Sequence, residues 1–117
     1  MKTIEQLQHE IGEWSKSRGW FPREGALDDP EFKALFVSSK LALVHSEVSE
    51  ALEAVREHKY EAYVANSKPE GCATELADAV IRILDLAEIL GLDLASAIDA
   101  KMLYNHTRPF KHGNKAI

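Results

Sequence analysis

The sequence predicts an all-α fold, a bundle of four to five helices formed by one domain that spans residues 1–117. Apolar side chains recur at intervals of three and four residues along most of the chain, which is the spacing of one helical face. Glycine and proline cluster between these runs, and no run shows the alternation that is typical of a half-buried strand. A chain of 117 residues is long enough for one hydrophobic core but too short for two.

The first helix is expected over residues 3–18. Thr3 and Gln6 have the spacing of a capping box, in which each side chain bonds the backbone N–H of the other residue. Gly19 follows the last apolar position, as is typical of a helix C-terminus. Glycines and prolines are too closely spaced in residues 19–30 for a regular element, so we predict a loop there.

A second helical run is expected from residue 31 to about residue 58. Asp29 followed by Pro30 is typical of a helix start, because an aspartate caps free N–H groups and proline fits the first turn. A break at Ser38 or Ser39 would divide the run, so it forms either one long helix or two. Its expected inward stripe comprises Leu41, Val44, Val48, Leu52 and Val55.

Two further helices are expected in the C-terminal half. Residues 63–71 contain Asn, Ser, Pro and Gly and are predicted to be a connector, after which residues 72–90 are strongly apolar. Asp93 then caps a last helix that ends near residue 106, and a basic tail follows. Apolar residues surround most of the third helix, more than the other helices of one chain can cover. We therefore predict a homo-oligomer, with a homodimer as the minimal form.

Composition excludes several classes of protein. Nineteen acidic residues against 14 basic ones give a net charge of -5, whereas a protein that binds nucleic acid usually needs a clustered basic surface. No stretch approaches the roughly 20 apolar residues of a membrane-spanning helix. Cys72 is the single cysteine, so no intrachain disulfide is expected, and the polar start lacks the apolar stretch of a secretory signal. We expect a cytoplasmic protein that binds neither membrane nor nucleic acid.

Two acidic pairs share one spacing. Glu47 and Glu50 are three residues apart in the second helical run, and Glu75 and Asp78 are three apart in the third. Residues at this spacing are neighbours on one helical face. If the two helices pack antiparallel, as their short connection suggests, the four carboxylates face each other across one groove. Like charges so close together need a compensating cation.

The chemistry of these residues indicates a metal site. Carboxylate oxygens suit Mg²⁺, with Mn²⁺ as a substitute, and Mg²⁺ often shares its coordination with substrate phosphates. A metal beside a carboxylate base is suited to the hydrolysis of a phosphoanhydride. On the third helix the acidic pair belongs to one narrow polar line on an otherwise apolar surface, formed by Glu75, Asp78, Arg82 and Asp85.

Two other interpretations of the acidic pairs stay open. Acidic pairs at this spacing are common on solvated helix faces, so the chain could instead be a non-catalytic helical interaction module. A di-iron carboxylate bundle also gathers four acidic residues, but it needs Glu-x-x-His motifs, and none of the five histidines follows a glutamate at that spacing. Metal binding separates the enzyme from the interaction module.

The motifs resemble those of the MazG-like family of the all-α NTP pyrophosphatase superfamily. Its signature is Glu-x-x-Glu followed by Glu-x-x-Asp, which Glu47, Glu50, Glu75 and Asp78 match. The segment TIEQLQHEIGEWSKSRGW resembles the usual opening helix, and KMLYNHTRPFKHGNK resembles the usual ending, so the resemblance covers nearly the whole chain. The chain departs from many members at Ser46, where they have another glutamate, which puts the number of metal ions in doubt.

The resemblance implies a Mg²⁺-dependent enzyme that cleaves a nucleoside triphosphate, most often a dNTP, to the monophosphate and pyrophosphate. The role would be nucleotide pool sanitation or dNTP control, and a dimer of dimers becomes an option. Glu47 and Glu50 would take part in catalysis, and all four acidic residues would bind metal. Residues that help to bind the nucleotide would be Lys101, Asn105 and Arg108. Superfamily relatives act on dUTP or phosphoribosyl-ATP, and the spacing excludes neither substrate.

Aromatic residues are candidates for contact with a nucleobase, because their faces stack on bases with little preference. Trp20 lies in the first loop and is the better candidate. Trp14 lies on the first helix and is expected to pack in the core.

Overall fold

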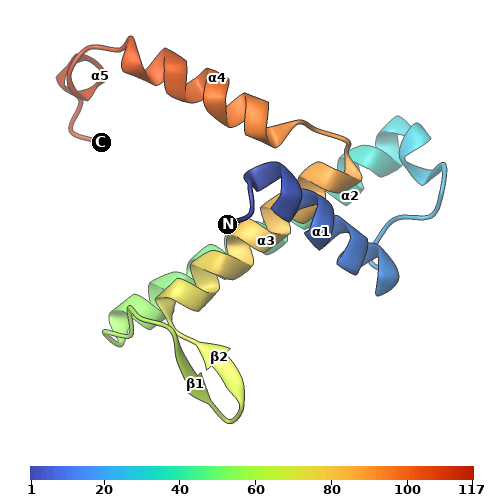
Figure 1. Cartoon of the computed structure of the whole chain (residues 1–117), viewed down its shortest axis with the longest axis horizontal. Coiled ribbons are helices and arrows are strands. Elements are labelled where there is room, and N and C mark those ends of the chain that lie inside the picture. Colours follow the sequence, from blue (N-terminus) through green and yellow to red (C-terminus); the bar gives the residue numbers. More distant parts are fainter.

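The fold is mostly helical, as predicted, and is seen here in a computed structural model that describes residues 1–117 (Figure 1). A short 3-10 turn and a hairpin of two strands interrupt the helices. The helices are α1 (Ile4–Ser17), α2 (Pro30–Arg56), α3 (Cys72–Ile89), α4 (Leu94–His106) and α5 (Lys111–Asn114), with the turn η1 (Ala26–Asp28) and the strands β1 (Tyr63–Ala65) and β2 (Lys68–Glu70).

The predicted helix starts are confirmed by their caps. The Thr3 side chain accepts a bond from the N–H of Gln6, and the Gln6 side chain accepts one from the N–H of Thr3. Asp29 accepts from the N–H of the second residue of α2, and Asp93 accepts from the N–H of Ser96 in α4. Each cap satisfies a donor that the first turn of a helix cannot pair internally.

The helix α2 is one uninterrupted helix, which decides between the two predicted forms. The Ser38 hydroxyl donates to the carbonyl of Ala34, and the Ser39 hydroxyl donates to the carbonyl of Phe36. Both serines thus bond the preceding turn of their own helix, which they can do without ending it.

The central feature is the antiparallel pair α2 and α3, which α1 crosses on one side (Figure 1). The two helices meet through small side chains, because Ala51 of α2 and Ala79 of α3 are both buried. The expected inward stripe on α2 is wrong in part: Leu41, Val48 and Leu52 are exposed in the single chain. The residues of α2 that are buried are instead Glu47 and Ala51.

The connector after α2 was predicted to be irregular, but it forms a small hairpin within the mostly helical fold. Tyr63 pairs with Glu70, and Ala65 pairs with Lys68. Asn66 and Ser67 have φ values of 52° and 63°, which is the left-handed backbone of a two-residue hairpin turn. Strands of three residues are too short to show an alternating pattern in the sequence.

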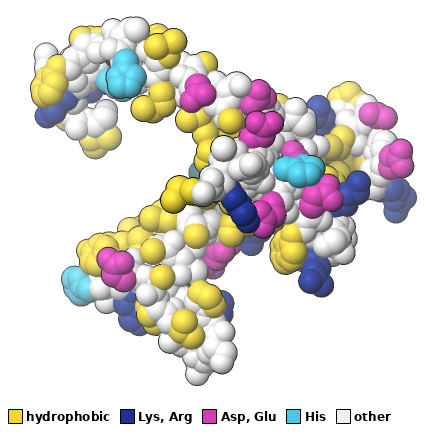
Figure 2. All heavy atoms as spheres, in the orientation of Figure 1, with side chains coloured by type: hydrophobic (Ala, Val, Ile, Leu, Met, Phe, Trp, Pro, Cys, Tyr) yellow, Lys and Arg dark blue, Asp and Glu magenta, His cyan; other side chains and the backbone are white.

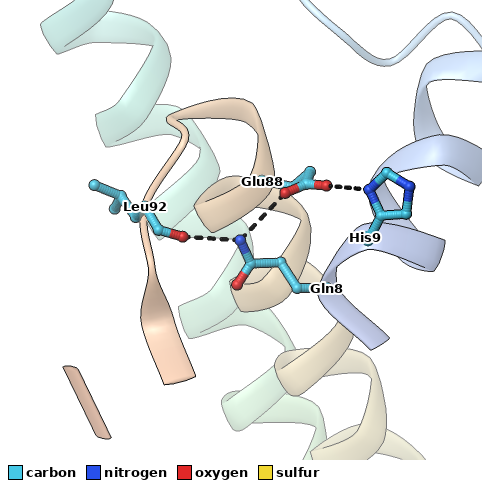
Figure 3. A network of polar contacts seen from close by, with 4 residues as sticks. All are labelled: Gln8, His9, Glu88 and Leu92. Atoms are coloured by element: carbon cyan, nitrogen blue, oxygen red, sulfur yellow. Dashed lines mark hydrogen bonds and ion pairs between the residues drawn. The ribbon is translucent and has the colours of Figure 1, made fainter. Parts of the chain in front are cut away.

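Polar contacts fix α1 to the C-terminal end of α3. Figure 3 shows Gln8 and His9 of α1 pointing toward Glu88 of α3. The Gln8 side chain donates to the Leu92 carbonyl at 2.9 Å, and His9 Nδ1 lies 3.1 Å from Glu88 Oε2. Gly12 is buried against Glu88, where a larger residue would overlap the glutamate side chain.

The helix α4 packs against α1 near its start and then extends away from the other helices (Figure 1). None of its residues is buried, and Leu103 is 71% exposed. Figure 2 shows apolar side chains along this arm and along the arm formed by α2 and α3, with an open recess between the two arms. None of the helices combines the length and the apolar character needed to span a membrane.

Candidate metal centre and adjoining cavity

Three carboxylates converge where α2 and α3 pack together. Glu47 of α2 lies opposite Glu75 and Asp78 of α3, and one oxygen from each lies within 4.8 Å of the others. Glu47 and Glu75 are 7% and 8% exposed, while Asp78 is half-buried. The antiparallel packing of two helices with acidic residues at i and i+3 produces this convergence. The sequence predicted these residues as one group.

Glu50, the fourth predicted carboxylate, lies beside Glu75 and outside the group of three. Burial, together with the neighbouring carboxylates of Glu50, Glu47 and Asp78, raises the pKa of Glu75 to about 7. No lysine or arginine acts against this rise, so the cations of the chain do not balance the negative charge at Glu75. The centre therefore has excess negative charge.

One cation of the chain does reach the cluster. Arg82 Nε donates to Glu47 Oε1 at 2.8 Å, from a position one turn after Asp78 on α3. Glu47 is mostly buried, so this ion pair orients its carboxylate as well as balancing its charge. The sequence placed Arg82 on the polar line of α3 but assigned it no role.

A cavity of about 570 Å³ adjoins the cluster between α1, α2, α3 and the first loop. Glu47 and Asp78 form part of its wall, and Trp14 and Trp20 line it at 56% and 61% exposure. The expectation that Trp14 packs in the core is therefore wrong. Trp20, which was predicted to contact a nucleobase, lines the same cavity. The other lining residues are Ile11, Ser15, Lys40, Leu43, Ile81, Arg82 and Asp85.

A second hollow, of about 290 Å³, lies on the hairpin side of the same cluster. Glu50 and Glu75 line it together with Lys59 and Lys68, two cations that the sequence analysis did not select. Lys59 Nζ lies 5.5 Å from the ring centroid of Tyr63, a residue of β1. These lysines were missed because the hairpin that carries Lys68 toward α2 was predicted to be an irregular connector.

The predicted nucleotide-binding residues of the last helix lie elsewhere in the single chain. Lys101, Asn105 and Arg108 are on α4 or just after it, and α4 extends away from the carboxylates (Figure 1). Lys101 Nζ lies 4.7 Å from the ring centroid of Tyr104, and the Arg108 guanidinium lies 5.8 Å from the same ring. One chain therefore brings together the four carboxylates and Trp20 but not these three residues.

The donor set of the cluster fits a hard divalent cation, because three carboxylates meet and retain uncompensated charge. Comparison with protein families, with curated proteins and with solved structures finds no match to this chain. The resemblance to the MazG-like family accordingly stays a prediction based on the motifs.

Proposed function

We propose that the chain is a Mg²⁺-dependent nucleoside triphosphate pyrophosphohydrolase of the MazG-like type. It would cleave a (d)NTP to the (d)NMP and pyrophosphate in the cytoplasm, for nucleotide pool sanitation or dNTP control. One observation carries the proposal: Glu47, Glu75 and Asp78 converge with excess negative charge at the wall of a cavity that two tryptophans line.

Glu47, Glu75 and Asp78 would bind the metal, with Glu50 beside them. Bound Mg²⁺ would supply neutralisation of the phosphate charge and activation of water, and Mn²⁺ would serve as a substitute. Arg82 keeps the Glu47 carboxylate oriented through their ion pair. Glu50 lies beside Glu75 and outside the group of three, and we propose that its carboxylate accepts the proton that hydrolysis releases.

The two hollows suggest how a nucleotide would lie. The larger one offers exposed aromatic faces and ends at Glu47 and Asp78, so it suits a base whose phosphates reach the cluster. The smaller one begins at Glu50 and Glu75 on the other side and contains Lys59 and Lys68. A triphosphate that crosses the cluster would leave its terminal phosphates near these lysines.

The exposed apolar faces support assembly with further copies of the chain. The accessible surface is 9113 Å², whereas a compact protein of 13.1 kDa exposes roughly 6,400 Å². The radius of gyration is 17.0 Å, against about 13 Å for a compact chain of this length. The excess area is of the size that an obligate dimer buries. We propose a homodimer or a dimer of dimers.

In such an assembly the helix α4 of one copy would reach the carboxylates of another. Lys101, Asn105 and Arg108 would then contribute to nucleotide binding, as the resemblance implies, although they lie far from the cluster in their own chain. Their positive charge would complement the triphosphate.

The direct test measures pyrophosphate and phosphate release from canonical and modified NTPs and dNTPs, including dUTP and phosphoribosyl-ATP. Each is assayed with Mg²⁺, with Mn²⁺ and with chelator. We expect metal-dependent release of pyrophosphate and a matching amount of monophosphate. If no nucleotide is turned over while the oligomer is intact, the enzyme proposal fails and the non-catalytic interaction module takes its place.

A further inference from the structure

Arg82 is the cation of the larger cavity that lies next to the carboxylate cluster. The wall of this cavity contains two cations, Lys40 and Arg82. The ammonium group of Lys40 lies over the rings of Trp20 and Phe36. The Arg82 side chain instead reaches Glu47, and it is 40% exposed. A ligand in the cavity can therefore contact Arg82 directly.

The guanidinium of Arg82 has donors that no residue of the chain uses. A guanidinium carries five N–H groups, one on Nε and two on each of its amino nitrogens. Only Nε is engaged, with Glu47 Oε1 at 2.8 Å. The next carboxylate on α3, Asp85, accepts from the Ser15 hydroxyl through Oδ2, and its Oδ1 has no partner. Both amino groups of Arg82 are thus available to an acceptor outside the chain.

The order of residues on α3 places Arg82 between the two ends of the cavity. It follows Asp78, a residue of the cluster, by four positions, which is about 6 Å along a helix. The bond from Ser15 to Asp85 holds the end of α1, which carries Trp14, beside α3 about 4.5 Å further on. A nucleotide with its base at the tryptophans and its later phosphates at the cluster has its first phosphate at the level of Arg82.

We propose that Arg82 binds the phosphate next to the sugar of the nucleotide through its two amino groups, while its Nε holds Glu47. The inference rests on the proposed function and assigns one contact of its substrate. Phosphate suits these donors, because a guanidinium directs two parallel N–H groups at two phosphate oxygens. Glu47 and Asp78 line the same cavity and would otherwise repel this phosphate, so a cation at this position also removes an unfavourable charge interaction.

The test compares the binding of the four dNMPs with that of the matching deoxynucleosides, which lack only the phosphate. Calorimetry measures both, so no hydrolysis is needed. The background is Glu47→Gln, in which Arg82 has no Glu47 carboxylate to orient. Adding Arg82→Gln to it should weaken the binding of at least one dNMP by about tenfold and leave the deoxynucleoside unchanged. Arg23→Gln, which removes an exposed arginine that lines neither hollow, should change neither affinity. If Arg82 acts only through Glu47, Arg82→Gln has no effect in this background, and the inference is overturned.

A second measurement uses the unmodified protein and does not depend on the folding of a variant. Phenylglyoxal reacts with the amino groups of arginine, and mass spectrometry follows its addition to Arg82. At least one dNMP should slow this reaction several-fold, whereas the matching deoxynucleoside should not, and Arg23 should react equally in both. Equal rates at Arg82 with dNMP and deoxynucleoside overturn the inference, and pyrophosphate release from triphosphates can still support the proposed function. If no triphosphate is hydrolysed, the proposed function fails, but protection of Arg82 that needs the phosphate still supports the inference.

Discussion

The helices α1 and α4 both pack on the rest of the chain, but they do so to very different degrees. Polar contacts from Gln8 and His9 (Figure 3) and from Ser15 anchor α1 to α3, and Gly12 lets the two helices approach closely. The helix α4 makes contact only near its first turns and buries none of its residues. The helix α1 is therefore held by side-chain bonds within the chain, whereas the apolar side chains of α4 stay exposed.

A single chain assembles only one part of the candidate site. The wall of the large cavity that α1 provides, and the carboxylates of α2 and α3, are assembled by a single chain. The apolar surface of α4 and the basic residues on it have no counterpart in that chain. A site that needs both sides needs a second copy.

The largest effect is expected for the carboxylates between α2 and α3. Asp78→Asn or Glu50→Gln should lower kcat/KM for a triphosphate by about 1,000-fold, which is roughly 4 kcal/mol in activation free energy. Each change removes a negative charge, which at Asp78 would bind the metal and at Glu50 would accept the proton. Steady-state kinetics checks this, with circular dichroism to confirm an unchanged helix content. Glu13→Gln changes an exposed carboxylate of α1 that lines neither hollow and should have little effect. Full activity of Asp78→Asn would remove this residue from the mechanism.

The exposed apolar surface of α4 is tested by making this helix more polar. The double variant Met102→Ser and Leu103→Ser removes two exposed apolar side chains and should dissociate the oligomer into monomers. Light scattering coupled to gel filtration measures the mass. Asp99→Ser, a change of an exposed polar residue in the same helix, should leave the mass unchanged. A monomeric unmodified protein would contradict the assembly proposed here.

The close packing of α1 against α3 is tested at Gly12. A methyl group there overlaps the Glu88 side chain, so Gly12→Ala should lower the free energy of unfolding by about 1–3 kcal/mol. Urea denaturation measures this loss. Glu13→Ala, at the exposed neighbouring position, should change stability by less than about 0.5 kcal/mol. Equal stability of the two variants would mean that α1 and α3 do not pack this closely.

A smaller effect is expected at the basic residues of α4. Lys101→Ala should raise KM about tenfold and change kcat by less than about threefold, because a lost phosphate contact weakens binding more than the chemical step. Lys115→Ala, in the C-terminal segment, serves as the control for a general loss of positive charge. An unchanged KM for Lys101→Ala would separate α4 from the nucleotide site.

The smallest effect concerns pH. The folded chain raises the pKa of Glu75 from 4.5 to about 7, so without metal the protein loses stability as pH rises through this window. Mg²⁺ competes with this proton, and its stabilising effect should therefore grow over the same window. The rise in Tm on adding Mg²⁺ should be larger near pH 8 than near pH 6. In Glu75→Gln this dependence on pH should disappear, and its persistence would assign it to another group.

The features that depend on local spacing could be predicted from the sequence. The capping residues and the i, i+3 acidic pairs depend on local spacing, so the helix starts and the convergence of Glu47, Glu75 and Asp78 followed from the sequence. The exposure of Leu41 and Leu52 did not follow, because it depends on which face of α2 meets α3. Small residues such as Ala51 allow the closer contact and turn the larger residues outward.

The hairpin and the cavity depend on contacts between distant residues. The strands are three residues long, below the length at which periodicity is informative. The bond between Ser15 and Asp85 joins positions 70 residues apart, and nothing in the local sequence of either residue predicts it. Trp14 was likewise expected in the core because the pattern on α1 does not show that a cavity lies beside it.

The hairpin also determines how the chain tolerates sequence change over evolutionary time. Gly71 follows β2 with φ of 102°, and any side chain there would overlap the carbonyl oxygen of Glu61. Its own carbonyl accepts the N–H of Glu75, so the first turn of α3 depends on it. The turn at Asn66 and Ser67 is exposed, so it can accept insertions even though its backbone is left-handed. Natural variation in this hairpin should therefore accumulate at its tip and stop abruptly at Gly71.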